Sequence, residues 1–150
     1  MTLREKKIVR VTREWIGTPY RHQASVKGQG CDCLGLLRGV WREVVGAEPE
    51  RVPSYTADWS EMGHEERLWA AAARNMTMVP VDTDKAGQVV LFRMRKGNVA
   101  KHLGILAGTD AGFSTVIHAY TDRGVIETPL TDTWIRKIVA QFQFPAKRGT

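Results

Sequence analysis

The sequence predicts an α+β fold in which N-terminal helices pack on an antiparallel β-sheet. In the first half of the chain apolar residues recur at helical spacing, whereas from about residue 88 they are grouped in strand-like runs. Turn sequences, and not helices, separate these runs, which favours an antiparallel meander over repeated β-α-β units. At 150 residues, 43% of them hydrophobic, the chain is expected to form one domain over residues 1–150.

Residues 2–16 are the first predicted helix. Thr2 and Glu5 have the spacing of a capping box, and Gly17 with Pro19 ends the helix. The apolar face of this helix is expected to consist of Leu3, Ile8, Val11 and Trp15. A glycine-rich loop follows over residues 17–30.

A second helix is predicted from Cys33 to Val45, with Asp32 as its N-cap and Gly46 just past its end. Its apolar stripe is formed by Leu36, Leu37, Val40, Trp41 and Val44. A third helix is expected over residues 60–75, after a surface crossing. The expected connection and strands follow at 78–84 (a turn), 88–93, 102–107, 114–120, 124–128 and 134–144.

Cys31 and Cys33 are the only cysteines, and they are too close in the chain to form an unstrained disulfide. A cysteine that opens a helix is well placed as a nucleophile, because the helix N-terminus stabilises a thiolate and its free N–H groups can hold an oxyanion. Glycines 28, 30 and 35 are interpreted as room for a peptide to approach the thiol. The alternative is that each cysteine is a small buried hydrophobic residue.

Two histidines could complete such a site. His102 and His118 lie in sequence-neighbouring strands, where side chains on one face can hydrogen-bond. His102 would serve as the base and His118 would orient it, which is the papain-like order of a helix-borne cysteine followed by sheet-borne partners. Structural roles are the alternative for any histidine, and His22 and His64 are interpreted in that way.

A Cys-x-Cys pair with histidines could also bind zinc, although the usual spacing of two residues between the cysteines is missing. No cofactor is therefore expected. The net charge of +6 suits an anionic partner or plain solubility, and dispersed basic residues argue against nucleic-acid binding. No run of 18 apolar residues or secretory leader is recognised, so the protein is expected to be made in the cytoplasm without a signal peptide and without a membrane span.

Several motifs in this order resemble the NlpC-type cell-wall cysteine peptidases, in particular the branch found with tail proteins of bacteriophages and gene transfer agents. They are Gly17-Thr18-Pro19-Tyr20, Cys31-Asp32-Cys33-Leu34-Gly35-Leu36, Ala86-Gly87-Gln88-Val89-Val90-Leu91-Phe92, Lys101-His102-Leu103-Gly104-Ile105-Leu106 and Ile117-His118-Ala119-Tyr120. The segments Arg38-Gly39-Val40-Trp41 and Phe142-Gln143-Phe144-Pro145 also look like that branch.

The resemblance implies a papain-like fold with Cys33 as nucleophile, His102 as base and His118 as the third residue. It also implies that Tyr20 assists substrate or oxyanion binding and that Asp32 helps to hold the amine end of the peptide. Two departures affect substrate recognition. Leu34 stands where many members have serine, and residues 21–24 replace an aromatic-Gly-Gly sequence.

The function implied is a thiol protease that cleaves peptidoglycan stem peptides, often between D-Glu and diaminopimelate. Its expected place is the tail of a phage-like particle, acting in the periplasm beside tail hub or tail-tip proteins. The alternative is a catalytically silent tail-tip protein of the same fold. Such a protein could dock through Trp59, Trp69 or Trp134, although core packing is another use for each of these side chains.

Overall fold

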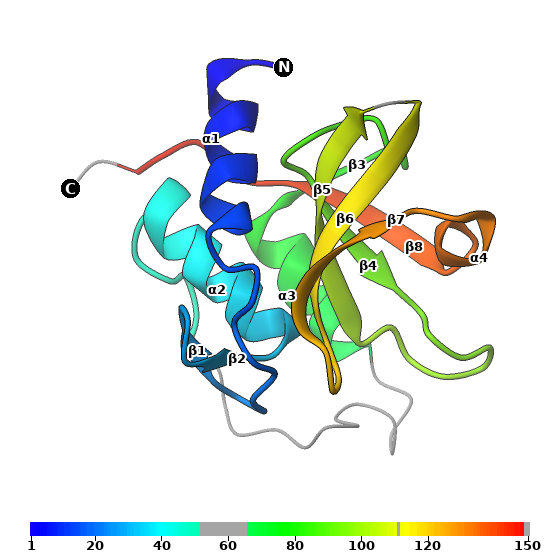
Figure 1. Cartoon of the computed structure of the whole chain (residues 1–150), viewed down its shortest axis with the longest axis horizontal. Coiled ribbons are helices and arrows are strands. Elements are labelled where there is room, and N and C mark those ends of the chain that lie inside the picture. Colours follow the sequence, from blue (N-terminus) through cyan, green and yellow to red (C-terminus); the bar gives the residue numbers. More distant parts are fainter. Residues whose placement is uncertain (52–65, 111, 149–150) are drawn as a thin grey trace.

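The computed structural model describes residues 1–51, 66–110 and 112–148 and has helices packed on an antiparallel sheet, as predicted (Figure 1). The helices are α1 (Leu3–Arg13), α2 (Cys33–Val44), α3 (Arg67–Asn75) and α4 (Asp132–Ile135). The strands are β1 (Ser25–Val26), β2 (Gly30–Cys31), β3 (Thr77–Val79), β4 (Val89–Phe92), β5 (His102–Asp110), β6 (Phe113–Tyr120), β7 (Gly124–Pro129) and β8 (Ile138–Gln143).

Helix α1 begins with the predicted capping box. The Thr2 hydroxyl accepts from the Glu5 amide at 3.1 Å, and the Glu5 carboxylate accepts from the Thr2 amide at 2.9 Å. The apolar face is confirmed at Ile8, Val11 and Trp15, which are buried. It is wrong at Leu3, which is 86% exposed because the first turn of α1 lies at the edge of the molecule (Figure 1).

Helix α2 is the element that carries Cys33, and it follows the prediction closely. Asp32 is its N-cap, and Gly46 follows the C-cap with a φ of 145°, a backbone conformation that favours glycine. All five residues of the predicted stripe are buried. Gly39 lets the Trp15 ring approach, since a Cβ at that position would lie 2.0 Å from a ring carbon.

The six-stranded sheet has the order β3-β8-β4-β5-β6-β7, with every neighbouring pair antiparallel. Strands β4 to β7 form the predicted meander. The predicted strand over 134–144 is wrong at its start, because residues 132–135 form the one-turn helix α4 behind the N-cap Thr131. Strand β8 then runs between β3 and β4.

Three further predictions were incomplete. Strand β3 occupies the start of the expected 78–84 connection, and the β1–β2 hairpin lies inside the expected 17–30 loop. The third helix is described from Arg67 onwards, while the earlier part of its predicted range, with His64, lies outside the described residues, as does Trp59.

The sheet has an apolar cluster on each face. The larger one packs α1, α2 and α3 against residues such as Leu91, Leu103 and Ile105. The smaller one lies on the other face and includes Val90 and Phe92, with Trp134 of α4 packed against it. No helix in the described ranges is long and apolar enough to cross a membrane.

Candidate active site

Cys33 is the first residue of α2, and its sulfur lies against the start of β5. The thiol donates to the carbonyl of Lys101 with a sulfur–oxygen distance of 3.6 Å. The amide of Leu103 hydrogen-bonds to the sulfur, together with the amides of Cys33 and Leu34 at the helix start. The sulfur is therefore held by the peptide units on both sides of His102.

The two histidines form the hydrogen-bonded pair that their positions in neighbouring strands suggested. His102 opens β5 and His118 lies in β6, and Nε2 of His102 is 2.7 Å from Nδ1 of His118. Gly104 lets β5 and β6 pack closely beside this pair, because an added Cβ would lie 2.5 Å from a methyl of Val116. The hydrogen bond uses Nε2 of His102 and leaves its Nδ1 as the ring nitrogen for a reacting group.

Aromatic rings enclose the imidazoles on the sheet face opposite α1 and α2. The Trp134 ring meets His118 edge-on at a centroid distance of 5.1 Å, and Phe92 and Tyr120 lie 5.6 and 5.9 Å from the His102 ring. His102 is only 8% exposed and His118 is fully buried. Trp134, considered from the sequence as a docking residue, thus packs on the histidine pair, and Trp69 packs partly buried against the main core.

This burial decides the protonation states of the resting site. Burial lowers the pKa of His102 to about 3, with a further contribution from the charge of His118, and lowers the pKa of His118 to about 4. Burial also raises the pKa of the Cys33 thiol to about 12, and the Asp32 carboxylate adds to this effect. Desolvation thus opposes the thiolate that the helix start favours and outweighs the three backbone amides that lower the thiol pKa, while burial favours the neutral form of both imidazoles.

Asp32 acts as a structural clamp for the start of α2. One carboxylate oxygen accepts from the Gly35 amide at 2.7 Å, and the other accepts from the Gln23 amide at 2.8 Å. The side chain is buried, with Nδ1 of His22 3.8 Å away. His22 itself is exposed. Asp32 thus joins the 17–30 segment to the helix that carries Cys33.

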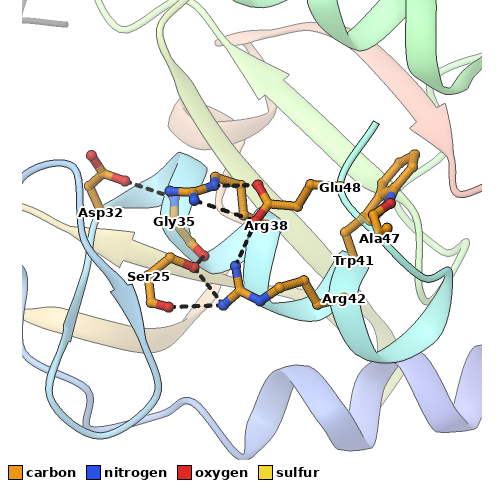
Figure 2. A network of polar contacts seen from close by, with 8 residues as sticks. All are labelled: Ser25, Asp32, Gly35, Arg38, Trp41, Arg42, Ala47 and Glu48. Carbon is orange, nitrogen blue, oxygen red and sulfur yellow. Dashed lines mark hydrogen bonds and ion pairs between the residues drawn. The ribbon is translucent and has the colours of Figure 1, made fainter. Parts of the chain in front are cut away.

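A polar network continues this clamp along α2 (Figure 2). The Ser25 hydroxyl donates to the Gly35 carbonyl at 2.6 Å, and Arg42 donates to the carbonyl and hydroxyl oxygens of Ser25 at 2.9 and 3.0 Å. Glu48 then accepts from Arg38 at 2.6 Å and from Arg42 at 3.1 Å. The network ties the β1–β2 hairpin to the first turns of the helix.

The glycines around Cys33 serve this packing, which corrects their interpretation as room for substrate. A Cβ at Gly35 would lie 1.9 Å from the carbonyl oxygen of Ala24, and one at Gly30 would lie 2.7 Å from the Arg21 side chain. Gly28 has a φ of 80° and belongs to the hairpin turn.

Tyr20 lies beside the thiol, half-buried. Burial, the Cys33 thiol and the Asp32 carboxylate raise the pKa of Tyr20, while a hydrogen bond from Thr121 opposes the increase. The phenol is therefore neutral and can donate a hydrogen bond. Tyr20 forms a β-bridge with Cys31, which brings the loop against the strand that precedes the helix.

Cys31 lies in a different environment from Cys33. It is fully buried, burial raises the pKa of its thiol to about 12, and its amide donates to the Pro19 carbonyl at 3.1 Å. Both cysteines are free thiols. Within the described part of the chain, no three or more His, Cys, Asp or Glu side chains are grouped so that they could hold a metal ion.

Thr128 is a member of the site that the sequence did not single out. Its hydroxyl oxygen, on β7, lies 2.8 Å from Nε2 of His118. The hydrogen bonds therefore form a chain from His102 through His118 to Thr128. Strand register contained the signal, because Thr128 pairs with Val116 and so lies diagonal to His118 on the neighbouring strand.

A helix-borne thiol beside a sheet-borne histidine pair, on helices packed against an antiparallel sheet, defines a papain-like α+β fold. The chain belongs to the NlpC/P60 family, which it matches over residues 17–143. This confirms the NlpC-type resemblance at the level of the family.

Three known proteins illustrate the similarity. The chain is 29% identical over 133 residues to a probable endopeptidase NlpC homolog of Haemophilus influenzae, covering 88% of this chain and 58% of that protein. The structure of NlpC1 from Trichomonas vaginalis superposes with a TM-score of 0.59 at 16% identity, over 96% of this chain and 45% of that one. The crystal structure of Ly7917 superposes with a TM-score of 0.59 at 18% identity, over 94% of this chain and 62% of that one. These two show the fold, and the chain spans little more than half the length of its curated relative.

Proposed function

We propose that this protein is a cysteine peptidase, a hydrolase that cleaves amide bonds in the stem peptides of peptidoglycan. The carrying observation is the pair of hydrogen-bonded imidazoles at 2.7 Å, with the Cys33 sulfur held by the peptide units that flank His102. Membership of the NlpC/P60 family and the endopeptidase name of the Haemophilus relative support the proposal.

The proposed mechanism starts from a neutral Cys33 thiol and a neutral His102 imidazole. As the Cys33 sulfur attacks the amide carbonyl, Nδ1 of His102 takes the thiol proton, so the charged pair forms only with the attack. The Cys33 amide, assisted by the Tyr20 hydroxyl, donates to the oxyanion. His102 then protonates the leaving amine. It next removes a proton from water, which hydrolyses the thioester and restores the thiol.

The proposal extends to the setting of the reaction. A role in the tail of a phage or gene transfer agent, aiding penetration of the cell wall, is supported by the motifs that resemble that branch. In that setting the protein is made in the cytoplasm, assembles with tail hub or tail-tip proteins and acts on the wall in the periplasm. The alternative is a catalytically silent tail-tip protein of the same fold.

Digestion of purified peptidoglycan tests the function. We expect the protein to release soluble muropeptides, and mass spectrometry should find new termini at one position of the stem peptide, between D-Glu and diaminopimelate. Folded protein that releases nothing from sacculi of several peptide chemistries would favour the silent alternative.

Thr128 should matter for the protonation pattern of the histidines. For Nδ1 of His102 to accept the thiol proton, Nε2 of His102 must carry a hydrogen and donate it to Nδ1 of His118. His118 then carries its own hydrogen on Nε2 and donates it to Thr128. An acceptor at position 128 therefore holds both rings in the productive tautomer.

We expect Thr128→Val to lower kcat/KM by about 10- to 100-fold with KM little changed, because the buried Nε2–H of His118 loses its acceptor. Thr128→Ser, which keeps the hydroxyl, should retain most of the activity. Imidazole ¹⁵N shifts should report the altered tautomer in the valine variant alone. Equal activity of the two variants, with unchanged shifts, would contradict the role.

A further inference from the structure

A recess opens beside the rings that pack on the histidine pair, and the chemistry described above does not use it. It has a volume of about 630 Å³ and lies between the segment after β4, the start of β5, the end of β6 and α4. Tyr120 and Trp134 line it, with ring centroids 5.9 and 6.1 Å from that of His102. Lys101 also lines the recess, and its backbone carbonyl accepts a hydrogen bond from the Cys33 thiol. The recess therefore borders the residues that pack on the His102 ring.

The charged residues that line this recess are all basic. Arg95, Lys101 and Lys137 contribute to it from three separate segments, and no acidic residue in the described ranges lines it. Lys137 is held in place, because its ammonium donates to the carbonyl of Met94 at 3.1 Å. Neither Arg95 nor Lys137 takes part in an ion pair with another described residue.

The position of the recess indicates which part of a substrate it would meet. His102 has to reach the leaving nitrogen to protonate it, so the leaving residue lies on the imidazole side of the thiol. The recess begins at the rings that pack on His102, which is that same side.

We propose that Arg95, Lys101 and Lys137 form a subsite for a carboxylate on the residue that supplies the leaving amine. This deepens the proposed function and rests on it. Arg95 can bind a carboxylate through two parallel hydrogen bonds, and the lysine ammonium groups add point charges. Stem peptides carry carboxylates on residues whose amines are acylated, so the subsite selects free acids over amidated peptides.

Two matched substrates test the subsite: synthetic stem peptides with the carboxyl of the leaving residue either free or amidated. The wild-type protein should cleave the free acid with a kcat/KM about tenfold or more above that of the amide. In Arg95→Gln/Lys137→Gln the ratio should fall to near one. The ratio is the readout, because a loss of folding or of chemistry lowers both rates together.

Lys6→Gln/Lys147→Gln is the control for net charge, since both lysines are exposed and neither lines the recess. It should keep the wild-type ratio. Equal cleavage of the two peptides by the wild-type protein, or an unchanged preference in the Arg95/Lys137 variant, would overturn the subsite.

A binding measurement separates the subsite from the peptidase function. Calorimetry with the Cys33→Ala protein should show tighter binding of the free acid than of the amide, and the Arg95/Lys137 substitutions should remove the difference. If the wild-type protein cleaves neither peptide but this difference is present, the proposed reaction fails and the subsite stands. If binding shows no preference, or no binding occurs, the subsite is refuted.

Discussion

Cys33→Ala is expected to abolish wall digestion, with a fall of about 10³-fold or more in the rate of peptide release. The sulfur is the only nucleophile that the site offers at the position held by the amides of Cys33, Leu34 and Leu103. Without it the amides and His102 remain, but no acyl-enzyme can form. Release of soluble muropeptides, followed by mass spectrometry over time, measures the effect.

Cys31→Ala is the matched control, because it removes the same atom two residues earlier in the chain. Cys31 is fully buried in the main apolar cluster and belongs to the strand before α2, so this variant should keep activity within about threefold of wild type per folded molecule. Truncation of a buried side chain costs stability, about 1 kcal/mol for so small a group, and rates must be normalised to folded protein. Loss of activity in the Cys31 variant with retention in the Cys33 variant would reverse the assignment.

The parts of the site that the sequence predicted are those with local rules. A single N-cap residue can mark the start of a helix, so Asp32 identified the cap of α2 and placed Cys33 on its first turn. Side chains in neighbouring strands can hydrogen-bond on a shared face, so His102 and His118 could be proposed as a pair, although their register came only with the structure. The change of hydrophobic period gave the α+β class for the same reason.

The protonation of the site could not be predicted, because it depends on residues that are distant in sequence. Phe92, Tyr120 and Trp134 come from three elements, and they exclude water from the imidazoles only when the sheet and α4 are assembled. The helix N-terminus suggested a thiolate, but that argument omits the desolvation that outweighs it. The start of strand β8 was also predicted wrongly, because α4 occupies residues 132–135. A helix of one turn is too short to show a helical repeat of apolar residues in the sequence.

The role of Thr128 is partly predictable from local sequence rules and partly dependent on the assembled fold. Once the turn between β6 and β7 is fixed, its register follows, and the diagonal neighbour of His118 can be named. A lone threonine in a strand carries no other sign of a role in the site. What links it to the chemistry is the hydrogen bond to His118, which needs the folded sheet.

His102→Gln is expected to lower activity at neutral pH by about 10³-fold. The glutamine amide can still donate to Nδ1 of His118, which preserves the packing of the pair, but it cannot accept the thiol proton. Lys6→Gln, at an exposed position on α1, should change the rate by less than about twofold and serves as the control. Activity above one-tenth of wild type in the His102 variant would show that another group is the base.

The pH profile should distinguish the loss of a base from a general disturbance of the site. With the pKa of the Cys33 thiol raised to about 12, the thiolate fraction at lower pH grows about tenfold for each pH unit. Residual activity of His102→Gln should therefore rise steadily with pH up to the limit of protein stability, because solvent hydroxide replaces the missing imidazole. Wild-type activity should instead be nearly constant around neutral pH, since a neutral His102 accompanies the thiol throughout that range. Parallel profiles for the two proteins would mean that the thiol loses its proton independently of His102, and the concerted transfer proposed for the neutral pair would then be wrong.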